Sequence, residues 1–262
     1  MYERFSIRGA QDFLGETERD LYASFTMAFQ PVWDSETETI YGHEALVRAP
    51  GGDNAAAVFS RIRPPARYDF DRLCRLKALE RAVEMSVPGL LFLNFLANSV
   101  LTRGNAIEAT VDAARALGFP PDRIILEFTE KEDVEDMPYL RRNVAANKPS
   151  GFRTAMDDFG AGYSGLQLLC RVTPDFIKVD RELIKNIDTD KRRYRIMQSM
   201  MDLLLDLGHI VIIEGVETYG EYSALQDLGA TRFQGYFLAP PRIDRLTTAE
   251  DILNRLRPGT AA

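Results

Sequence analysis

Short apolar runs alternate along the chain with longer stretches in which apolar positions recur every three or four residues. The first pattern predicts buried strands and the second predicts amphipathic helices. Runs of the first kind predict eight strands, within residues 26–33, 39–49, 90–96, 123–130, 153–160, 175–183, 210–217 and 233–240. Stretches of the second kind predict helices at residues 71–85, 106–118 and 195–208. Gly118 and Gly208 stand where glycine commonly ends a helix.

The order of these elements predicts the fold class. Strands that alternate with helices need crossover connections, which favour a parallel sheet. The length of 262 residues allows one large domain or two small ones, and eight strands in that length favour a closed (β/α)8 barrel over a doubly wound sheet. Because no Pro- or Ser-rich linker divides the chain, we expect one domain at residues 23–247. Residues 1–22 are expected to form a partly helical N-terminal extension, and residues 248–262 a C-terminal helix with a frayed tail.

Polar residues interrupt the predicted strands at or near their carboxyl ends. A strand buried in a barrel is expected to be almost wholly apolar. One such residue can cap a helix or lie at the surface, but the repetition over seven strands favours a shared site. The carboxyl ends of barrel strands converge on one rim, where barrel enzymes place their chemistry. The residues are Glu44, Asn94, Glu127, Glu130, Asp157, Asp158, Lys178, Asp180, Glu214, Glu217 and Gln234.

Composition narrows the chemistry of that site. The formal net charge of −7 argues against binding of a nucleic-acid polymer. His43 and His209 are the two histidines and Cys74 and Cys170 the two cysteines, which excludes a His-rich metal centre, a thiolate zinc site and a disulfide framework. No apolar run approaches the ~20 residues that span a bilayer, and the first ten residues contain no signal core. We therefore expect a cytoplasmic protein that does not bind membranes.

Oxygen atoms are the ligands that remain for a cation at the rim. They suit hard divalent ions such as Mg²⁺, Mn²⁺ or Ca²⁺. Asp157 beside Asp158 suits a carboxylate that bridges two ions about 4 Å apart. Lys178 among carboxylates and a phosphate becomes a charge partner for the transition state or for the attacking water. The pattern therefore predicts metal-assisted hydrolysis of a phosphate ester.

The same residues resemble the EAL domain family of cyclic-di-GMP phosphodiesterases. The naming motif stands as Glu44-Ala45-Leu46, and "FLNFLAN", "ILEFTE", "DDFGAGYSGL", "DFIKVDREL", "IIEGVE" and "QGYFLAPP" follow in the family's order. The resemblance runs from Phe29 to Pro241 and implies a modified TIM (β/α)8 barrel with one antiparallel strand. The segment after the naming motif, "VRAPGGDNAAAVFSRIRPP", is shorter than in many members. It resembles that of a compact subgroup, and we expect no attached sensor domain.

The resemblance implies two Mg²⁺ or Mn²⁺ ions and inhibition by Ca²⁺. The implied ligands of the first ion are Glu44, Asn94, Glu127 and Asp157, and those of the second are Asp157 and Asp158. Asp180 and Glu214 are implied at or near the ions. The implied catalytic residues are Lys178, Glu214 and Asp158, and the resemblance leaves open whether Glu214 is a general base or a metal ligand.

Other positions are implied to bind substrate or to shape the loops of the site. Leu46, Arg48 and Gln234 would contact the substrate. Four residues would hold or shape the mobile loops, namely Glu130, Gly160, Ser164 and Glu217. The implied reaction opens one phosphodiester of cyclic di-GMP to give linear pGpG, and the implied assembly is a homodimer.

Two alternatives to the enzyme stay open from the sequence. One is a non-catalytic receptor for cyclic di-GMP or a protein-interaction module on the same fold, with a regulatory protein as partner. The other is an unrelated barrel that acts on a different phosphodiester, which would make the ordered motif set a coincidence. Every implied metal-ligand position and Lys178 are present, and this favours the enzyme.

Overall fold

The structure is a computed structural model that describes residues 21–49, 58, 59, 62, 66–103, 106–129, 131, 132, 134–162 and 165–257. Residues 1–20 of the expected N-terminal extension, the predicted loop residues Glu130 and Ser164, and the tail from residue 258 lie outside this part of the chain. The predicted division into three segments, at residues 1–22, 23–247 and 248–262, stays a prediction.

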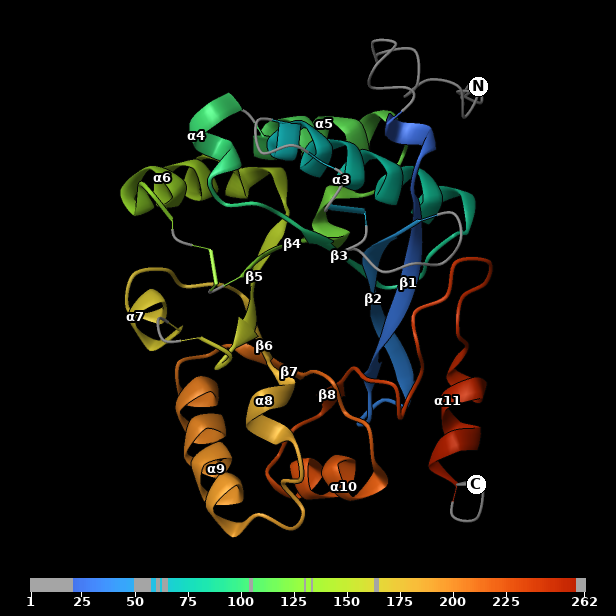
Figure 1. Ribbon diagram of the computed structural model, residues 1–262, viewed down its shortest axis with the longest axis vertical. Helices are drawn as coiled ribbons and strands as arrows, with labels where there is room; N and C mark the ends of the chain where they lie inside the picture. The colour runs from blue at the N-terminus through green and yellow to red at the C-terminus, as the bar shows by residue number, and fades with distance from the viewer. Residues whose placement is uncertain are drawn as a thin grey trace.

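Eight strands form a closed barrel in chain order, as predicted (Figure 1). The strand β1 runs antiparallel to both of its neighbours, β2 and β8, and all other neighbouring pairs are parallel. The expectation of a modified TIM barrel with one antiparallel strand is confirmed. The strands are β1 (Thr26–Asp34), β2 (Thr39–Arg48), β3 (Leu90–Asn94), β4 (Ile124–Thr129), β5 (Arg153–Phe159), β6 (Phe176–Val179), β7 (Ile210–Ile213) and β8 (Arg232–Phe233).

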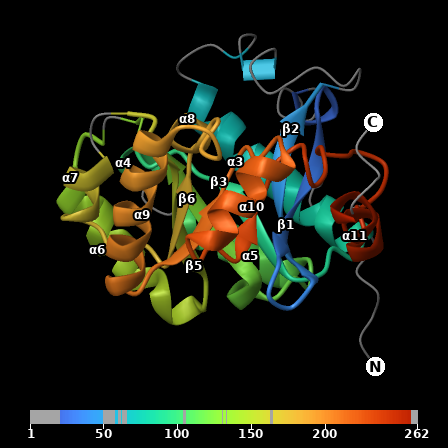
Figure 2. The same cartoon turned by 90° about the horizontal axis from the view of Figure 1, so that it is seen from below.

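Helices surround the barrel (Figure 2). Figure 1 shows α3 and α5 on one side of the ring of strands and α8, α9 and α10 on the opposite side. In the described part of the chain, no helix combines the length and the apolar character needed to cross a membrane. The helices are α3 (Arg67–Glu84), α4 (Ser99–Arg103), α5 (Ala106–Ala116), α6 (Met137–Asn147), α7 (Gly165–Leu169), α8 (Arg181–Ile184), α9 (Lys191–Asp206), α10 (Tyr219–Asp227) and α11 (Ala249–Leu256), with 3-10 turns at Pro121–Arg123 and Lys148–Ser150.

Several boundaries differ from the predicted ones, among them the start of α3 at Arg67 instead of residue 71 and the end of β6 at Val179, before helix α8. Helix α9 begins at Lys191, ahead of the periodic stretch at residues 195–208, because the side chain of Asp190 accepts hydrogen bonds from the first free backbone N–H groups and caps the helix. The predicted strand at residues 233–240 is wrong beyond its first residue. Gln234 still donates its backbone N–H to Ile213 O (2.8 Å), but the chain then turns, and Leu238 N bonds to Gly235 O at 3.1 Å.

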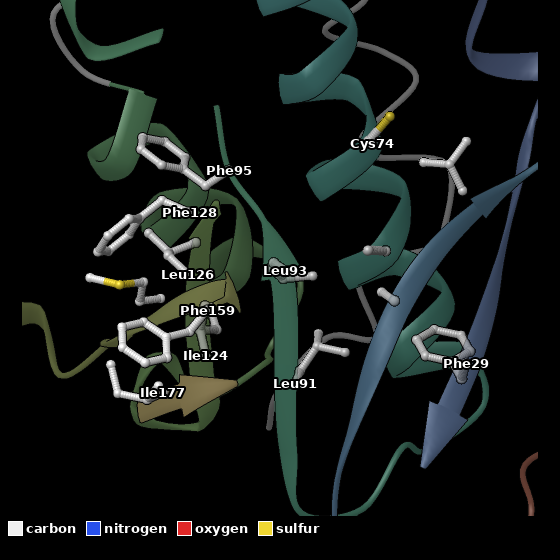
Figure 3. Packing of buried hydrophobic residues seen from close by; sticks show 14 of the residues in the cluster. Phe29, Cys74, Leu91, Leu93, Phe95, Ile124, Leu126, Phe128, Phe159 and Ile177 are labelled. Atoms are coloured by element: carbon white, nitrogen blue, oxygen red, sulfur yellow. The ribbon is translucent and has the colours of Figure 1, made fainter. Parts of the chain in front are cut away.

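Buried apolar residues form two separate layers. The outer core lies between the strands and the helices; Figure 3 shows part of it, to which β3 contributes Leu91 and Leu93 and α3 contributes Cys74. The inner core fills the barrel itself. Because side chains alternate along a strand, a residue two positions beyond an inner-core residue points into the barrel again, one layer nearer its mouth. The inner core consists of Val32, Phe92, Ile125, Ala155, Phe176 and Ile212.

Two arginines close the other end of the barrel. Arg153, two positions before Ala155, lies 5.1 Å from the ring centre of Phe176, and Arg232 lies 4.6 Å from that of Tyr41. Arg232 also pairs with Asp34 at 3.3 Å. The barrel is therefore a packed core and not a pore, and the end where the parallel strands finish is where barrels of this kind carry their functional side chains.

Candidate metal and catalytic site

A layer of polar side chains lies directly above the inner core. On five parallel strands, a polar residue stands two positions after an inner-core residue, within the last three residues of the strand or just past its end. Period-two alternation therefore points all five side chains into the mouth of the barrel. The pairs are Phe92 with Asn94, Ile125 with Glu127, Ala155 with Asp157, Phe176 with Lys178, and Ile212 with Glu214.

The Lys178 ammonium group lies at the centre of this layer, with no exposed surface. Its Nζ is 2.6 Å from Glu214 Oε1, 2.8 Å from Glu127 Oε1, 3.1 Å from Glu44 Oε2 and 3.2 Å from Asp157 Oδ1. We call these four carboxylates the acidic cluster. They come from β2, β4, β5 and the end of β7, so residues as far apart as 44 and 214 share one cation.

One ammonium group leaves the acidic cluster short of positive charge. Burial by itself lowers the pKa of Lys178, but the four carboxylates outweigh it and hold that pKa well above the usual range. Burial likewise raises the pKa of Glu127 and of Glu214 well above that of an ordinary glutamate, and Lys178 offsets this only in part. A buried group of carboxylates in this condition is suited to bind a further cation.

The donor set fits a hard divalent cation. Glu44, Glu127 and Asp157 each offer an oxygen within 4.8 Å of the others. Both oxygens of Glu127 are buried, and neither makes a hydrogen bond of regular geometry within the described residues. Asn94 donates its Nδ2 to Glu44 Oε1 (3.2 Å), which leaves its amide oxygen as a further ligand. Carboxylate and amide oxygens are the ligands of Mg²⁺ and Mn²⁺.

A β-bulge brings Asp158 to the same mouth as Asp157. Adjacent residues of a regular strand face opposite sides of the sheet. The register between β5 and β6 shifts between Met156 and Phe159, and Asp158 has a left-handed backbone with φ of 56°. Burial and a hydrogen bond to Asp158 raise the pKa of Asp180, which shows that these two carboxyl groups are close neighbours.

The predicted substrate residues do not all meet at the acidic cluster. Gln234 does, because its Nε2 donates to Glu44 Oε2 (2.8 Å) and to Gln30 Oε1 (3.3 Å). Leu46 lies in the lining of two cavities beside the cluster. Arg48 ends β2 and donates its Nη1 to the carbonyl of Val47 at 2.7 Å; the described lining of neither cavity includes it.

The two cavities lie on either side of Glu44 and Leu46. The first has a volume of about 320 Å³ and reaches from Glu127 and Asp157 to Phe95. The second has a volume of about 380 Å³ and reaches from Glu214 and Gln234 to Asp180 and the exposed ring of Tyr236. The acidic cluster is thus accessible to a ligand that extends to both sides of it.

Two of the predicted loop residues lie in the described part of the chain. Glu217 Oε2 pairs with Arg181 Nη2 at 2.6 Å, which ties the segment after β7 to helix α8. Gly160 follows the aspartate pair with φ of 92°, and a Cβ there would lie 2.1 Å from Leu183 Cδ1. No other residue fits that position without displacing Leu183.

Several residues around the site were not singled out from the sequence. Gln30 carries a usable signal, because it is a polar residue inside the apolar run of β1. The others lie at or just past the end of β4 or in helices α8 and α10, and their importance depends on which of these segments meet in space. They are Thr129 and Lys131, which contact Asp158, and Arg181 and Glu221, which join the ends of β6 and β7.

A family model described as EAL domain matches residues 17–241 of the chain. Among solved structures, the c-di-GMP-bound form of a standalone versatile EAL protein from Vibrio cholerae O395 has a TM-score of 0.81 at 42% identity, over 86% of this chain and 94% of that one. The manganese and c-di-GMP complex of BlrP1 from Klebsiella pneumoniae has a TM-score of 0.79 at 34% identity, over 84% of this chain and 56% of that one.

Curated relatives are similar over most of this chain but over only part of their own length. The blue light- and temperature-regulated antirepressor BluF from Escherichia coli is 28% identical over 218 residues, which are 83% of this chain and 54% of that protein. The probable cyclic di-GMP phosphodiesterase PdeA from Escherichia coli is 28% identical over 217 residues, 81% of this chain and 30% of that protein. The chain thus spans about half or less of the length of these two relatives.

Proposed function

The chain belongs to the EAL domain family, and on that premise we propose that it hydrolyses cyclic di-GMP to linear pGpG with the help of divalent cations. The observation that carries the proposal is the buried Lys178 surrounded by the four carboxylates of the acidic cluster. A structural ion pair needs one carboxylate for one ammonium group. The excess of acids is suited to cations that neutralise a phosphodiester.

The residues proposed to hold the cations are those that the family resemblance implies, and the donor set around Lys178 supports those of the first ion. Glu44, Asn94, Glu127 and Asp157 would hold one Mg²⁺ or Mn²⁺ ion, and Asp157 and Asp158 a second, with Asp180 beside them. When bound, the ions would lower the pKa of the attacking water and neutralise charge on the phosphate. The likeness to a manganese complex with c-di-GMP supports this choice of ion and substrate.

Lys178 and Glu214 are the pair that would manage the proton of the attacking water. Their charged atoms are 2.6 Å apart, so a water that reaches one of them reaches both. Glu214 is placed to accept a proton, and Lys178 to donate a hydrogen bond that orients the water or stabilises charge on the phosphate. Gln234 fixes Glu44 through its Nε2. Leu46 and Arg48 would contact the substrate, the latter after releasing the carbonyl of Val47.

A binding role without cleavage is the second candidate function. The relative named as an antirepressor, BluF, matches 83% of this chain, which supports a version of the fold that acts on a partner protein. In that case the cavities beside Glu44 and Leu46 would hold cyclic di-GMP intact. The complete set of acids around Lys178 favours the enzyme, because binding alone does not need them.

A homodimer through α9 is the assembly that the surface supports best. Ile196 and Leu203 are 48% and 42% exposed on the outer face of this helix. Arg192 precedes them on that face and Asp206 follows them, and both are exposed. Two copies of α9 packed antiparallel about Ser199 would therefore bring basic ends against acidic ends, which is the self-complementarity that two-fold symmetry requires.

The test of the enzyme incubates the purified chain with cyclic di-GMP and Mg²⁺ or Mn²⁺ and separates the nucleotides by chromatography. We expect linear pGpG to accumulate, and EDTA to stop its formation. Glu127→Gln and Lys178→Met are expected to lower turnover by about 100-fold or more, the loss typical of groups that transfer protons or stabilise developing charge. Glu84→Gln removes a carboxylate at the exposed end of α3 and is the matched control.

Folding of the variants is measured in the same experiment. Lys178→Met leaves four buried carboxylates without their ammonium group, so its melting temperature is determined with EDTA and with Mn²⁺. A variant that melts like the wild type in Mn²⁺ but does not cleave has lost chemistry and not structure. Intact nucleotide with both metals, together with tight binding in calorimetry, would favour the receptor. Absence of both cleavage and binding would contradict both functions.

A further inference from the structure

Lys131 places a second ammonium group at the mouth of the barrel. It lies in the turn after β4, and its Nζ is 3.2 Å from Asp158 Oδ2. The same oxygen accepts a hydrogen bond from Thr129 Oγ1 at 3.0 Å. The Lys131 side chain is 52% exposed and that of Asp158 31%. The ammonium group therefore approaches the carboxylate from the solvent side of the site.

The ammonium groups of Lys178 and Lys131 each contact one member of the aspartate pair, Asp157 and Asp158. Lys178 contacts Asp157 Oδ1 from inside the barrel, and Lys131 contacts Asp158 Oδ2 from outside it. The charge of Asp180 also contributes to the raised pKa of Lys131, and the carboxyl group of Asp180 hydrogen-bonds to that of Asp158. Each lysine thus stands beside the carboxylates of one of the two cation positions assigned above.

The two lysines differ in how firmly they are held. Lys178 is enclosed by four carboxylates and has no exposed surface, so it is a permanent part of the site. Lys131 has one carboxylate in direct contact and a half-exposed, flexible stem. A half-exposed ion pair contributes little stability, and its ammonium group can swing into water at small cost. Lys131 is therefore the lysine that a cation can displace from its carboxylate.

We propose that Lys131 is a tethered counter-ion for the outer cation position, occupying Asp158 until a divalent ion binds there. The inference rests on the proposed function in one respect, the binding of divalent ions. A divalent ion at Asp158 must displace the ammonium group from this carboxylate and is repelled by it nearby. Lys131 therefore weakens binding at the outer position and leaves the inner position, at Glu44 and Glu127, almost unchanged.

The test is a Mn²⁺ titration of the metal-free full chain, followed through the electron paramagnetic resonance signal of free Mn²⁺. We expect Lys131→Gln to tighten the weaker class of Mn²⁺ sites about three- to tenfold, equal to about 0.7–1.4 kcal/mol. The tighter class should not change. Lys131→Arg keeps the charge and should behave like the wild type. The difference between Lys131→Gln and the wild type should shrink in high salt, because an exposed pair is screened.

Lys148→Gln is the matched control. Lys148 is 50% exposed and lies 3.5 Å from Asp175, in the turn before β5 and away from the mouth of the barrel. Lys148→Gln removes one positive charge from the chain, as Lys131→Gln does. It therefore controls for the effect of net charge, and we expect its Mn²⁺ isotherm to match that of the wild type. Equal tightening in both glutamine variants would overturn the proposal.

The remaining outcomes separate this inference from the proposed function. An isotherm of Lys131→Gln that superimposes on that of the wild type, or shows weaker outer binding, overturns the role of Lys131 alone. One Mn²⁺ ion in the wild type and two in the variant would support it, whereas one in both would overturn it. A wild-type chain that binds no Mn²⁺ would overturn the cation sites themselves, and with them both proposals.

Discussion

At the scale of single residues, burial decides which charged groups interact strongly. Lys178 and Lys131 have the same side chain and each lies about 3 Å from a carboxylate of the aspartate pair. Lys178 has no exposed surface and four acidic partners, so its charge cannot be removed without a large cost. Lys131 is half-exposed, and water can replace its partner. The same residue type therefore has a permanent role in one place and an exchangeable one in the other.

His43 shows the effect of burial without a charged partner. It precedes Glu44 on β2, but its side chain faces the outer core, because it pairs in register with Leu91 while Glu44 pairs with Phe92 of the inner core. It has no exposed surface. Burial lowers the pKa of His43 to about 4, so the imidazole is neutral in the folded chain at neutral pH.

His43 should make the folded state sensitive to acid. Its pKa is about 4 when folded and about 6.5 when unfolded, so the unfolded chain binds the extra proton as the pH falls from 6.5 towards 4. The contribution of neutral His43 to the free energy of unfolding is therefore fully present above pH 6.5, and it is lost progressively as the pH falls towards 4. Between pH 7 and pH 5 the wild type should lose about 1–2 kcal/mol more than His43→Gln, measured by urea unfolding. Parallel pH profiles of the two proteins would contradict this.

At the scale of elements, the ends of the strands matter more than the strands themselves. The bulge in β5 turns both Asp157 and Asp158 into the mouth, which a regular strand of the same sequence cannot do. At the next strand ends, Arg181 donates to the carbonyl of Gly215 and pairs with Glu217 and Glu221. These contacts join the segments that carry Asp180 and Glu214.

Glu221 is the centre of that junction. It is 2% exposed, and its carboxylate accepts backbone N–H bonds from Asn186 (3.0 Å), Glu217 (2.9 Å) and Thr218 (3.3 Å). Burial opposes the charge, but these hydrogen bonds and Arg181 hold the pKa of Glu221 below its usual value. It also forms the capping box of α10 with Thr218.

Removal of Glu221 should loosen both segments at once. Glu221→Ala leaves several buried donors unpaired and should destabilise the fold by about 2–3 kcal/mol. Amide hydrogen exchange at residues 181–186 and 215–218 should speed up together. The matched control is Asp251→Ala, which breaks the capping box of α11 with Thr248 and should cost about 1 kcal/mol without changing exchange at the two segments. Unchanged exchange there in Glu221→Ala would show that the junction does not hold them.

At the scale of the whole molecule, closure of the barrel creates the site. No two members of the acidic cluster are neighbours in sequence, and each comes from a different strand or from the residue just after it. The shared mouth also explains why the two cavities meet at Glu44. The proposed dimer interface is connected to this site through the chain, because α9 leads directly into β7 and so towards Glu214.

The proposed dimer predicts the result of a charge reversal on α9. Arg192→Asp with Arg195→Asp would place acidic residues against Asp202 and Asp206 of the other copy and should raise the dimer dissociation constant about tenfold or more. Adding Asp202→Arg and Asp206→Arg restores opposite charges and should restore the dimer. Sedimentation equilibrium measures both changes.

A reversal on a different helix provides the control for this prediction. Arg115→Asp changes an exposed arginine of α5, which is 53% exposed and pairs with Asp112 within its own helix. It should leave association unchanged. A wild-type chain that stays monomeric at all concentrations, or a dimer that tolerates the reversal on α9, would contradict the proposed interface.

Local pattern was sufficient to predict the barrel and most of the polar rim. Strand and helix periods reflect which side chains are buried, so they are readable without the fold. That reading located all eight strands, and it placed Glu44, Asn94, Glu127, Lys178 and Glu214 at or near the carboxyl ends of the predicted strands. It failed after Phe233, where an apolar run forms a turn and Gly235 packs so close to the backbone of Val216 that a Cβ would lie 2.1 Å from its carbonyl oxygen.

The contacts between strand ends could not be predicted from the sequence and are visible only in the tertiary structure. The period of a regular strand predicts that Asp158 faces away from Asp157. The register shift between β5 and β6 instead turns Asp158 to the same side as Asp157. The roles of Arg181 and Glu221 depend on the approach of two segments 40 residues apart, where Arg181 Nη1 donates to Glu221 Oε2 at 3.4 Å. Nothing in the sequence distinguishes Lys131 from other lysines in turns, because its contact with Asp158 exists only in the folded chain. Charge pairs across a barrel mouth have no period along the chain, because closure of the sheet and not local propensity decides them.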